Sequence, residues 1–179
     1  IHAESLKLTN IINDILELNQ MDNGRPNLVH ENTNVAALVK RLDDSWKTRA
    51  LERDIDLWVE TDNDEIMMPV DNMLIQQLLT HLVGNAFKFT PDGGKVHVRL
   101  QEKGTAVRLT VEDSGIGIPE DKLGEIFDRF FQVDGSTTRE HNGQGVGLAL
   151  CHDIATNHEG RIWAENVETG GTRFTVLLP

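Results

Sequence analysis

Cysteine and basic residues are both scarce in this chain. Its 179 residues include one cysteine, Cys151, so it can form no internal disulfide and no cysteine-based metal cluster, which suits a reducing compartment. We interpret Cys151 as a small buried hydrophobic residue. Lys and Arg number 17 against 29 Asp and Glu, for a formal net charge of -12, whereas nucleic-acid binding normally depends on a concentrated basic surface. We therefore expect no nucleic-acid partner, and any anion that binds must be held by a local site.

Long apolar runs are also missing. No run approaches the roughly 20 residues that cross a bilayer, and the first residues lack the basic-then-apolar order of a signal peptide. We expect these residues to be cytoplasmic and to make no membrane contact, whether or not a parent protein is anchored in a membrane. The hydrophobic share of 39% is enough for one core, which favours a single domain with an appendage.

The appendage is a predicted helix at the start of the chain. Pro26 cannot continue a helix and Gly24 suits a helix end, so we place a boundary between residues 1–23 and a domain at 24–179. The alternative is a helix that packs on that same domain. The apolar residues of this helix recur at spacings of three and four: Leu8, Ile11, Ile15 and Leu18.

Residues 24–179 alternate between helical and strand patterns. Helices are predicted from Val35 to Trp46, from near Asp71, and from Leu148 to Ile154. We predict an α+β fold, a two-layer α/β sandwich in which helices cover one face of a mixed, mostly antiparallel sheet, preceded by the N-terminal bundle helix. Apolar and polar residues alternate in the predicted strands, which lie at 55–60, 96–100, 107–111, 162–165 and 173–178.

Three polar side chains follow one stripe of the helix that begins near Asp71. His81, Asn85 and Lys88 stand at positions i, i+4 and i+7, so they project in one line. Asn85 offers a carbonyl oxygen suited to Mg²⁺, and Lys88 can neutralise phosphate charge. The stripe is either solvated surface or a site. A separate stripe forms the predicted core face: Ile75, Leu78, Leu79, Leu82 and Ala86.

Asp113 follows a predicted strand and precedes a glycine-containing turn with Gly115, Gly117 and Ile118. A carboxylate there can accept a hydrogen bond from the exocyclic amine of adenine, and the glycines let the backbone approach a flat ring. An ordinary Asp-Ser-Gly turn is the alternative, although it does not explain the second glycine.

A second glycine run, Gly143, Gly145 and Gly147, immediately precedes the last predicted helix. Free backbone N-H groups at a helix N-terminus form a phosphate cradle. The run is not the dinucleotide-binding fingerprint, because no strand directly precedes it and its spacing differs. Residues 132–145 before it lack a regular pattern over more than the usual connection length, and we predict a functional lid there.

Four segments in this order resemble the N, G1, F and G2 boxes of the catalytic, ATP-binding domain of two-component sensor histidine kinases, which has the Bergerat fold. They are HLVGNAFKFT at 81–90, DSGIGIP at 113–119, FDRFFQVD at 127–134 and GQGVGLAL at 143–150. The sequence LTNIINDILELNQMDNG resembles the second helix of the dimerisation and phosphoacceptor hairpin of the same kinases, which forms a four-helix bundle in a homodimer.

The resemblance implies ATP and Mg²⁺ as cofactors and assigns roles to residues of this chain. Asn85 would bind Mg²⁺, Lys88 would contact the nucleotide, Phe89 would lie by the base and Asp113 would recognise adenine. The remaining implied ATP contacts are Gly115, Gly117, Ile118, Arg129, Gly143, Gln144, Gly145, Val146, Gly147 and Leu148. From the sequence alone, Arg129 either reaches a phosphate or pairs with an acid such as Asp128 or Asp134.

The implied activity is that of a protein-histidine kinase. The γ-phosphoryl group of ATP would pass to a histidine and then to an Asp of a response regulator receiver domain. No histidine of this chain stands in the acceptor context of the family, so we expect a fragment that cannot phosphorylate itself and needs an acceptor helix in trans.

Two positions depart from the commonest pattern and keep other functions open. His81 occupies the place where ATPases such as gyrase and the Hsp90 chaperones carry a water-activating Glu, which makes ATP hydrolysis with His81 as base an alternative. Gln132 stands where some kinases have an Arg for the γ-phosphate, which is the one hint of a pseudokinase that serves as a nucleotide-dependent interaction module.

Overall fold

A computed structural model describes residues 28–132 and 145–179 of the chain. The predicted helix at 1–23 and all of the predicted lid except its two end residues lie outside the described residues.

The centre of the fold is a five-stranded sheet. β2 and β4 run parallel, and every other neighbouring pair is antiparallel, which confirms the predicted mixed, mostly antiparallel sheet. β4 and β5 form a hairpin. In spatial order the strands are β2 (Asp56–Thr61), β4 (Lys95–Lys103), β5 (Ala106–Asp113), β7 (Thr172–Leu178) and β6 (Arg161–Asn166).

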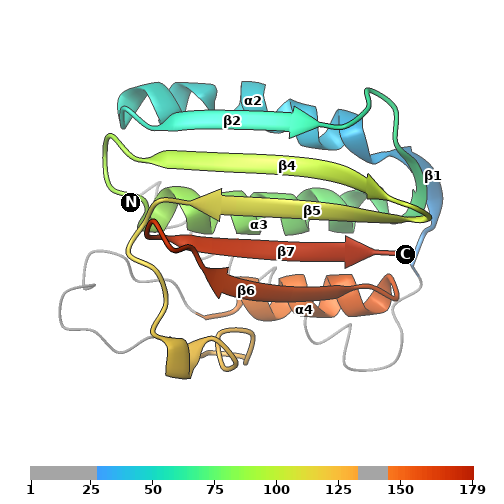
Figure 1. Cartoon of the computed structure of the whole chain (residues 1–179). Coiled ribbons are helices and arrows are strands. Elements are labelled where there is room, and N and C mark those ends of the chain that lie inside the picture. The colour runs from blue at the N-terminus through green and yellow to red at the C-terminus, as the bar shows by residue number, and fades with distance from the viewer. Residues whose placement is uncertain (1–27, 133–144) are drawn as a thin grey trace, which may run out of the picture.

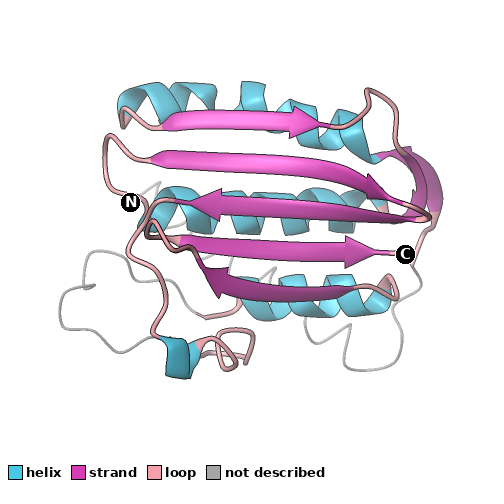
Figure 2. Ribbon diagram, in the orientation of Figure 1, coloured by secondary structure: helices cyan, strands magenta, loops and turns pink. Residues whose placement is uncertain are grey.

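Three α-helices lie on one face of this sheet, as Figures 1 and 2 show. They are α2 (Val35–Glu52), α3 (Asn72–Phe89) and α4 (Gly147–Asn157). The predicted two-layer sandwich is therefore confirmed. Asp71 caps α3 as predicted, because its Oδ1 accepts hydrogen bonds from the N-H groups of Met73 (3.1 Å) and Leu74 (3.2 Å). None of the helices in the described part is long and apolar enough to cross a membrane.

Two short strands were not predicted. β1 (Glu31–Asn34) and β3 (Met67–Val70) pair antiparallel as a separate small sheet. Neither has a usable sequence pattern, because β1 is made of polar residues and β3 contains Pro69. A short 3₁₀ helix, η1 (Glu120–Lys122), was also not predicted.

The core lies between the sheet and the helices. Every residue of the predicted core face of α3 is at most 2% exposed, and Phe87 is fully buried beside them. The Phe87 ring lies 4.9 Å from that of Trp46, which joins α3 to α2. Cys151 on α4 is buried as predicted.

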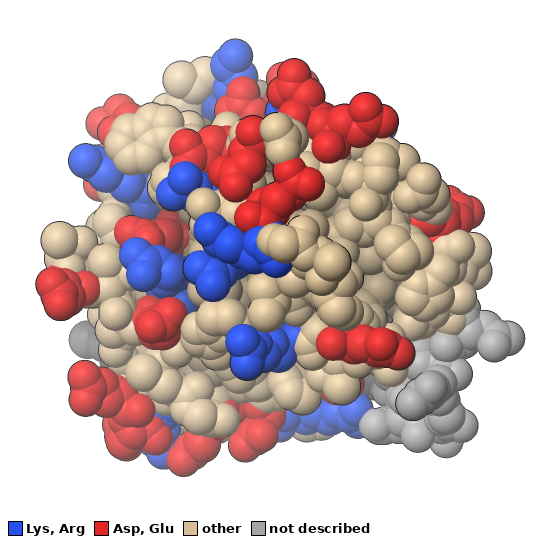
Figure 3. All heavy atoms as spheres, turned by 45° about the vertical axis from the view of Figure 1, so that its right-hand side comes forward, with Lys and Arg blue, Asp and Glu red and all other residues tan. Residues whose placement is uncertain are grey.

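The face of the sheet without helices is exposed and polar. Ion pairs cross the strands on this face, for example Arg99 with Glu60 (2.9 Å) and Arg173 with Glu112 (2.7 Å). In Figure 3, Lys and Arg gather in the middle of the view, whereas Asp and Glu gather along the top, at the level of α2 and β2.

Candidate functional site

The predicted site residues meet at one end of the sandwich. The last turn of α3, the end of β5 and the start of α4 all lie at the left of Figure 1. α3 packs against both β5 and α4, so segments more than 20 residues apart in the sequence are neighbours here.

The polar stripe of α3 faces this end of the molecule. His81, Asn85 and Lys88 are each partly exposed, whereas the residues between them are mostly buried. The Lys88 Nζ atom lies 4.7 Å from the centre of the Phe89 ring, and partial burial lowers the pKa of Lys88. The stripe therefore ends in an ammonium group placed over an aromatic ring that is itself 36% exposed.

Asp113 lies at the end of β5 and is only 5% exposed. Its Oδ1 accepts hydrogen bonds from the N-H groups of Gly115 (2.8 Å) and Thr172 (3.4 Å). No group in the described part of the chain donates to Oδ2, which leaves that oxygen for another donor. Burial raises the pKa of Asp113 to about 6, and the two backbone hydrogen bonds oppose that rise.

Glycines allow the backbone to pack closely around Asp113. A Cβ at Gly115 would lie 2.5 Å from the carbonyl oxygen of Phe89, so the turn after β5 lies directly on the end of α3. A Cβ at Gly171, whose φ is +95°, would overlap the carbonyl oxygen of Asp113. Neither Gly171 nor Thr172 was among the site residues predicted from the sequence.

Asn166 holds the turn that contains Gly117 and Ile118. Its Oδ1 accepts from the Ile118 N-H (2.9 Å), and its Nδ2 donates to the Ile118 carbonyl (2.6 Å). Gly117 has a φ of +72°, which a side chain would strain. Asn166 was missed because it is 48 residues from its partner in the sequence.

His81 is in contact with the start of α4. A Cβ at Gly147 would lie 2.9 Å from the His81 Nδ1 atom, so the imidazole rests on the first residue of that helix. α4 begins without a side-chain cap from the described residues. Its first N-H groups are therefore available to an anion, as a phosphate cradle requires.

The segment before α4 is only partly described. Gly143 and Gln144 lie outside the described residues. Gly145 has a φ of +69°, and its carbonyl accepts from the Phe130 N-H (2.9 Å), which joins the two ends of the predicted lid. Val146 is buried and Leu148 packs against the core, so neither side chain is free to reach far into a ligand site.

Arg129 makes an ion pair with Asp153 of α4, at 3.1 Å. This acid is neither of the two examples named from the sequence, of which Asp134 lies outside the described residues. The pair is about one-third exposed on both sides. Such a pair contributes little to stability and can be broken by a stronger anion.

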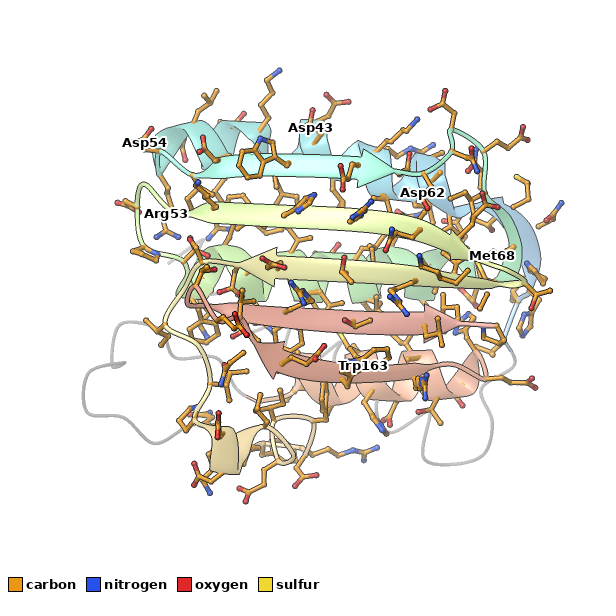
Figure 4. All side chains as sticks on the ribbon, viewed as in Figure 1. Asp43, Arg53, Asp54, Asp62, Met68 and Trp163 are labelled. Carbon is orange, nitrogen blue, oxygen red and sulfur yellow. The ribbon has the colours of Figure 1, made fainter. Side chains whose placement is uncertain are left out.

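Arg53 was missed entirely. Its guanidinium group donates to the carbonyl oxygens of Phe87 and Thr90 (2.8 Å for Thr90) and pairs with Asp92 (2.8 Å). Figure 4 shows Arg53 at the same end of the sheet as the site. It satisfies carbonyl groups that the end of α3 leaves without helical partners, directly beside Lys88 and Phe89.

Metal binding at this place would depend on few protein ligands. The described residues include no group of three or more His, Cys, Asp and Glu side chains that could hold a metal ion. Asn85 fits an ion such as Mg²⁺ that keeps several waters and takes further oxygen ligands from a bound phosphate.

A family model matches residues 70–179 of the chain, described as histidine kinase-, DNA gyrase B-, and HSP90-like ATPase. The chain is 35% identical over 177 residues to hybrid signal transduction histidine kinase D of Dictyostelium discoideum and 31% identical over 186 residues to sensor histidine kinase WalK of Bacillus subtilis. These matches cover 96% and 98% of this chain, but the chain spans only 11% and 29% of those proteins.

Solved structures agree with these similarities. The catalytic domain of histidine kinase ThkA in a nucleotide-free form is 32% identical, with a TM-score of 0.75 and coverage of 84% of this chain and 95% of that one. ThkA in complex with the response regulator protein TrrA is 29% identical, with a TM-score of 0.78 and coverage of 98% and 48%.

Proposed function

The chain belongs to the family of histidine kinase-, DNA gyrase B- and HSP90-like ATPases and contains the ATP-binding catalytic domain of a histidine kinase, and we propose that it binds Mg-ATP between α3, β5 and α4 and donates the γ-phosphoryl group to a histidine. The acceptor histidine lies outside these residues, and an Asp of a response regulator receiver domain takes the group in turn.

The geometry of Asp113 carries this proposal. One carboxylate oxygen is fixed by two backbone N-H groups, and the other is left for the exocyclic amine of adenine. Guanine presents a carbonyl oxygen at the corresponding position, which an ionised carboxylate repels. The site is therefore selective for adenine nucleotides.

The phosphates extend from this base site toward the start of α4. Lys88 neutralises phosphate charge, and the uncapped N-H groups at Gly147 and Leu148 cradle the oxygens. Asn85 holds Mg²⁺, which, when bound, offsets negative charge on the phosphate oxygens. What this chain supplies to the transfer is position and electrostatics, because phosphoryl transfer proceeds in line with little covalent participation by the protein.

The division of the chain follows from the same proposal. Residues 1–23 are the second helix of a dimerisation and phosphoacceptor hairpin, and residues 24–179 are the catalytic domain. In a full-length parent the hairpin forms a homodimer and presents the acceptor histidine to the ATP site.

A first experiment measures nucleotide binding by calorimetry in the presence of MgCl₂. We expect the chain to bind ATP and ADP but not GTP, and Asp113→Asn to weaken ATP binding by at least about tenfold, the equivalent of one charge-assisted hydrogen bond. Arg108→Gln on the opposite face of the sheet serves as the control and is expected to bind normally. Equal affinity for GTP and ATP would contradict the assignment of Asp113.

One observation favours ATP hydrolysis as a second candidate function. His81 lies between the Asn85 stripe and the first residue of α4, where it could accept a proton from a water near the γ-phosphate. The discriminating assay is phosphate release from Mg-ATP by this chain without any acceptor. Turnover that His81→Gln abolishes would establish hydrolysis, whereas no turnover would leave His81 with its packing role against Gly147.

A further inference from the structure

β2 forms one edge of the five-stranded sheet. As in any parallel pair, every second residue of β2 directs its backbone N-H and C=O groups toward β4. These are the even positions, because the N-H groups of Asp56 and Asp62 donate to the carbonyl oxygens of Gly94 (2.9 Å) and Leu100 (3.0 Å). The residues at odd positions, Leu57, Val59 and Thr61, therefore point their N-H and C=O groups away from the sheet. No strand of the described residues pairs with this edge.

A groove runs beside that edge, between β2 and α2. It has a volume of about 580 Å³ and is lined by Lys40 and Asp43 of α2, residues 57–60 of β2 and His97 of β4. Leu57 and Val59 are only half-buried within it, and Trp58 on the outer face is 51% exposed. The edge thus combines free backbone groups with apolar side chains that are not fully covered.

The charged residues in and beside the groove are mainly acidic, and some of them are paired. Glu60 is paired with Arg99, and Lys40 with Asp64. In contrast, Asp43, Asp56 and Asp62 form no ion pair with the residues that the structure describes, although Lys95 stands beside Asp56 in the register of β2 and β4. Figure 4 shows Asp43 on α2 and Asp62 beyond the end of β2, and the acidic top of Figure 3 lies at the same level.

These charges disfavour a second copy of the chain as the occupant. Antiparallel pairing of two β2 strands about Val59 would place Asp56 opposite Asp62 of the other copy at both ends of the ladder. Like charges directly opposite each other destabilise a strand pair. A long edge strand without proline, as β2 is, remains a template for another kind of chain.

We propose that the edge of β2 binds an extended, basic segment of a partner protein, which adds to the sheet as a further strand. The segment pairs its backbone with Leu57, Val59 and Thr61 and places small apolar side chains in the groove. Basic side chains six positions apart, about 20 Å along a strand, match Asp56 and Asp62. The proposal is independent of nucleotide binding, because none of these residues belongs to the ATP site.

The test uses a fluorescent peptide, Arg-Val-Thr-Val-Thr-Val-Arg, and fluorescence anisotropy with the 179-residue chain. Replacement of both arginines by glutamate is expected to weaken binding at least tenfold. Two further peptides are N-methylated at alternate residues, one at the odd and one at the even positions. Since only one edge of the peptide can face β2, one of them should lose binding and the other retain it. Equal binding of both, or of the glutamate peptide, would overturn the proposal.

Substitutions in β2 itself test the same edge. Val59→Pro removes an outward N-H and leaves the hydrogen bonds between β2 and β4 in place, which is where a strand tolerates proline. We expect it to lower peptide affinity at least tenfold, whereas Val59→Ala lowers it less than threefold. The double variant Asp56→Asn, Asp62→Asn is expected to bind the arginine peptide at least tenfold more weakly than the parent chain does.

Two controls separate peptide binding at the β2 edge from binding at the ATP site and from self-association. Each variant should bind Mg-ATP as the parent chain does, and Asp113→Asn should leave peptide binding unchanged. Sedimentation equilibrium of the chain alone tests self-pairing, and a dimer that Val59→Pro dissolves would overturn the proposal in favour of a second copy. If Val59→Pro does not fold, the N-methylated peptides still decide the question.

Discussion

The carboxyl group of Asp113 accepts a hydrogen bond from adenine most strongly when it is ionised, yet its burial favours the protonated form. With the pKa raised to about 6, the group is mostly ionised at pH 7 and mostly protonated at pH 5. We predict that ATP affinity falls up to about tenfold per pH unit below pH 6. Calorimetry between pH 5 and 7.5 checks this, and Asp113→Asn should bind weakly with no such dependence. A flat profile for the parent chain would contradict the assigned role.

The same burial means that ionised Asp113 destabilises the folded domain when no nucleotide is bound. A carboxyl whose pKa is raised on folding adds stability below its unfolded value of 3.8 and loses it as the pH rises through about 6. The loss is on the order of 1 to 3 kcal/mol. We therefore predict that Asp113→Asn has a higher Tm than the parent chain at pH 7 without nucleotide, although it binds ATP less well. A lower Tm for the variant at pH 7 would show that the ionised carboxylate does not destabilise the folded domain.

His158 has the opposite pH dependence. It is buried, its Nε2 accepts from the Asp71 N-H (3.0 Å), and its Nδ1 donates to the Ile154 carbonyl (2.8 Å), so the neutral ring satisfies both partners. Burial lowers its pKa, and the nearby His30 ring lowers it further. Its contribution to stability is present above the unfolded pKa of about 6.5 and is lost as the pH falls below it.

We predict that, in the Asp113→Asn background, the Tm of the chain decreases between pH 7 and pH 5 and that His158→Gln reduces this decrease. Thermal unfolding of both proteins in matched buffers, in the Asp113→Asn background, isolates the histidine from Asp113. An unchanged pH dependence in His158→Gln would mean that groups other than His158 govern the acid response.

At the scale of elements, the end of α3 depends on Arg53 of the α2 C-terminus. Three hydrogen bonds join its guanidinium group to Phe87, Thr90 and Asp92. We predict that Arg53→Ala destabilises the chain by about 2 kcal/mol, since it leaves partly buried carbonyl groups unsatisfied. Hydrogen exchange should increase at residues 86–90 in particular. Arg49→Ala removes a nearby arginine that lies over the Trp46 ring, and it should cost less than about 1 kcal/mol.

α3 and α4 contact each other where the His81 ring lies on Gly147. Gly147→Ala would push its Cβ to within 2.9 Å of His81, so we predict a displaced imidazole and ATP binding weakened several-fold, with the fold retained. Gly84→Ala on α3 is the matched control, because its Cβ would meet only Trp46 at an ordinary 3.7 Å. We expect the control to gain roughly 0.5 to 1 kcal/mol of stability from helix propensity and to bind ATP normally. Indistinguishable ATP affinities of the two variants would contradict this role of Gly147.

Local periodicity was sufficient to predict most elements but not the contacts that complete the site. The i, i+4, i+7 stripe of α3 and the strand before Asp113 follow from side-chain spacing alone, and both are observed. Arg53, Asn166 and Thr172 were missed because their partners lie 34 to 59 residues away, where no spacing rule applies. The pairing of β1 with β3 was missed for a related reason, since strands of four residues are too short for a pattern of their own and form where they find a neighbour.

At the scale of the whole molecule, the five-stranded sheet keeps the proposed ATP site and the proposed partner-binding edge apart. The helices cover one face, and the proposed ATP site occupies the end where α3 stops and α4 starts (Figure 1). The acidic groove lies beside β2, at the edge of the sheet. A partner strand at that edge would therefore leave access to the nucleotide open. The net charge of -12 makes the few local cationic groups at the ATP site, Lys88 above all, important for attracting a polyanion.

Transfer of phosphate from ATP to a histidine supplied in trans tests the proposed function most directly. The chain is mixed with radiolabelled Mg-ATP and the phosphoacceptor hairpin of its parent protein, and label on the hairpin is measured before and after acid treatment. We predict acid-labile label on the hairpin only, none on the chain alone, and at least tenfold less with Asp113→Asn. Tight ATP binding without transfer to the hairpin, or release of the label as free phosphate at the same rate with and without it, would contradict a histidine kinase donor site.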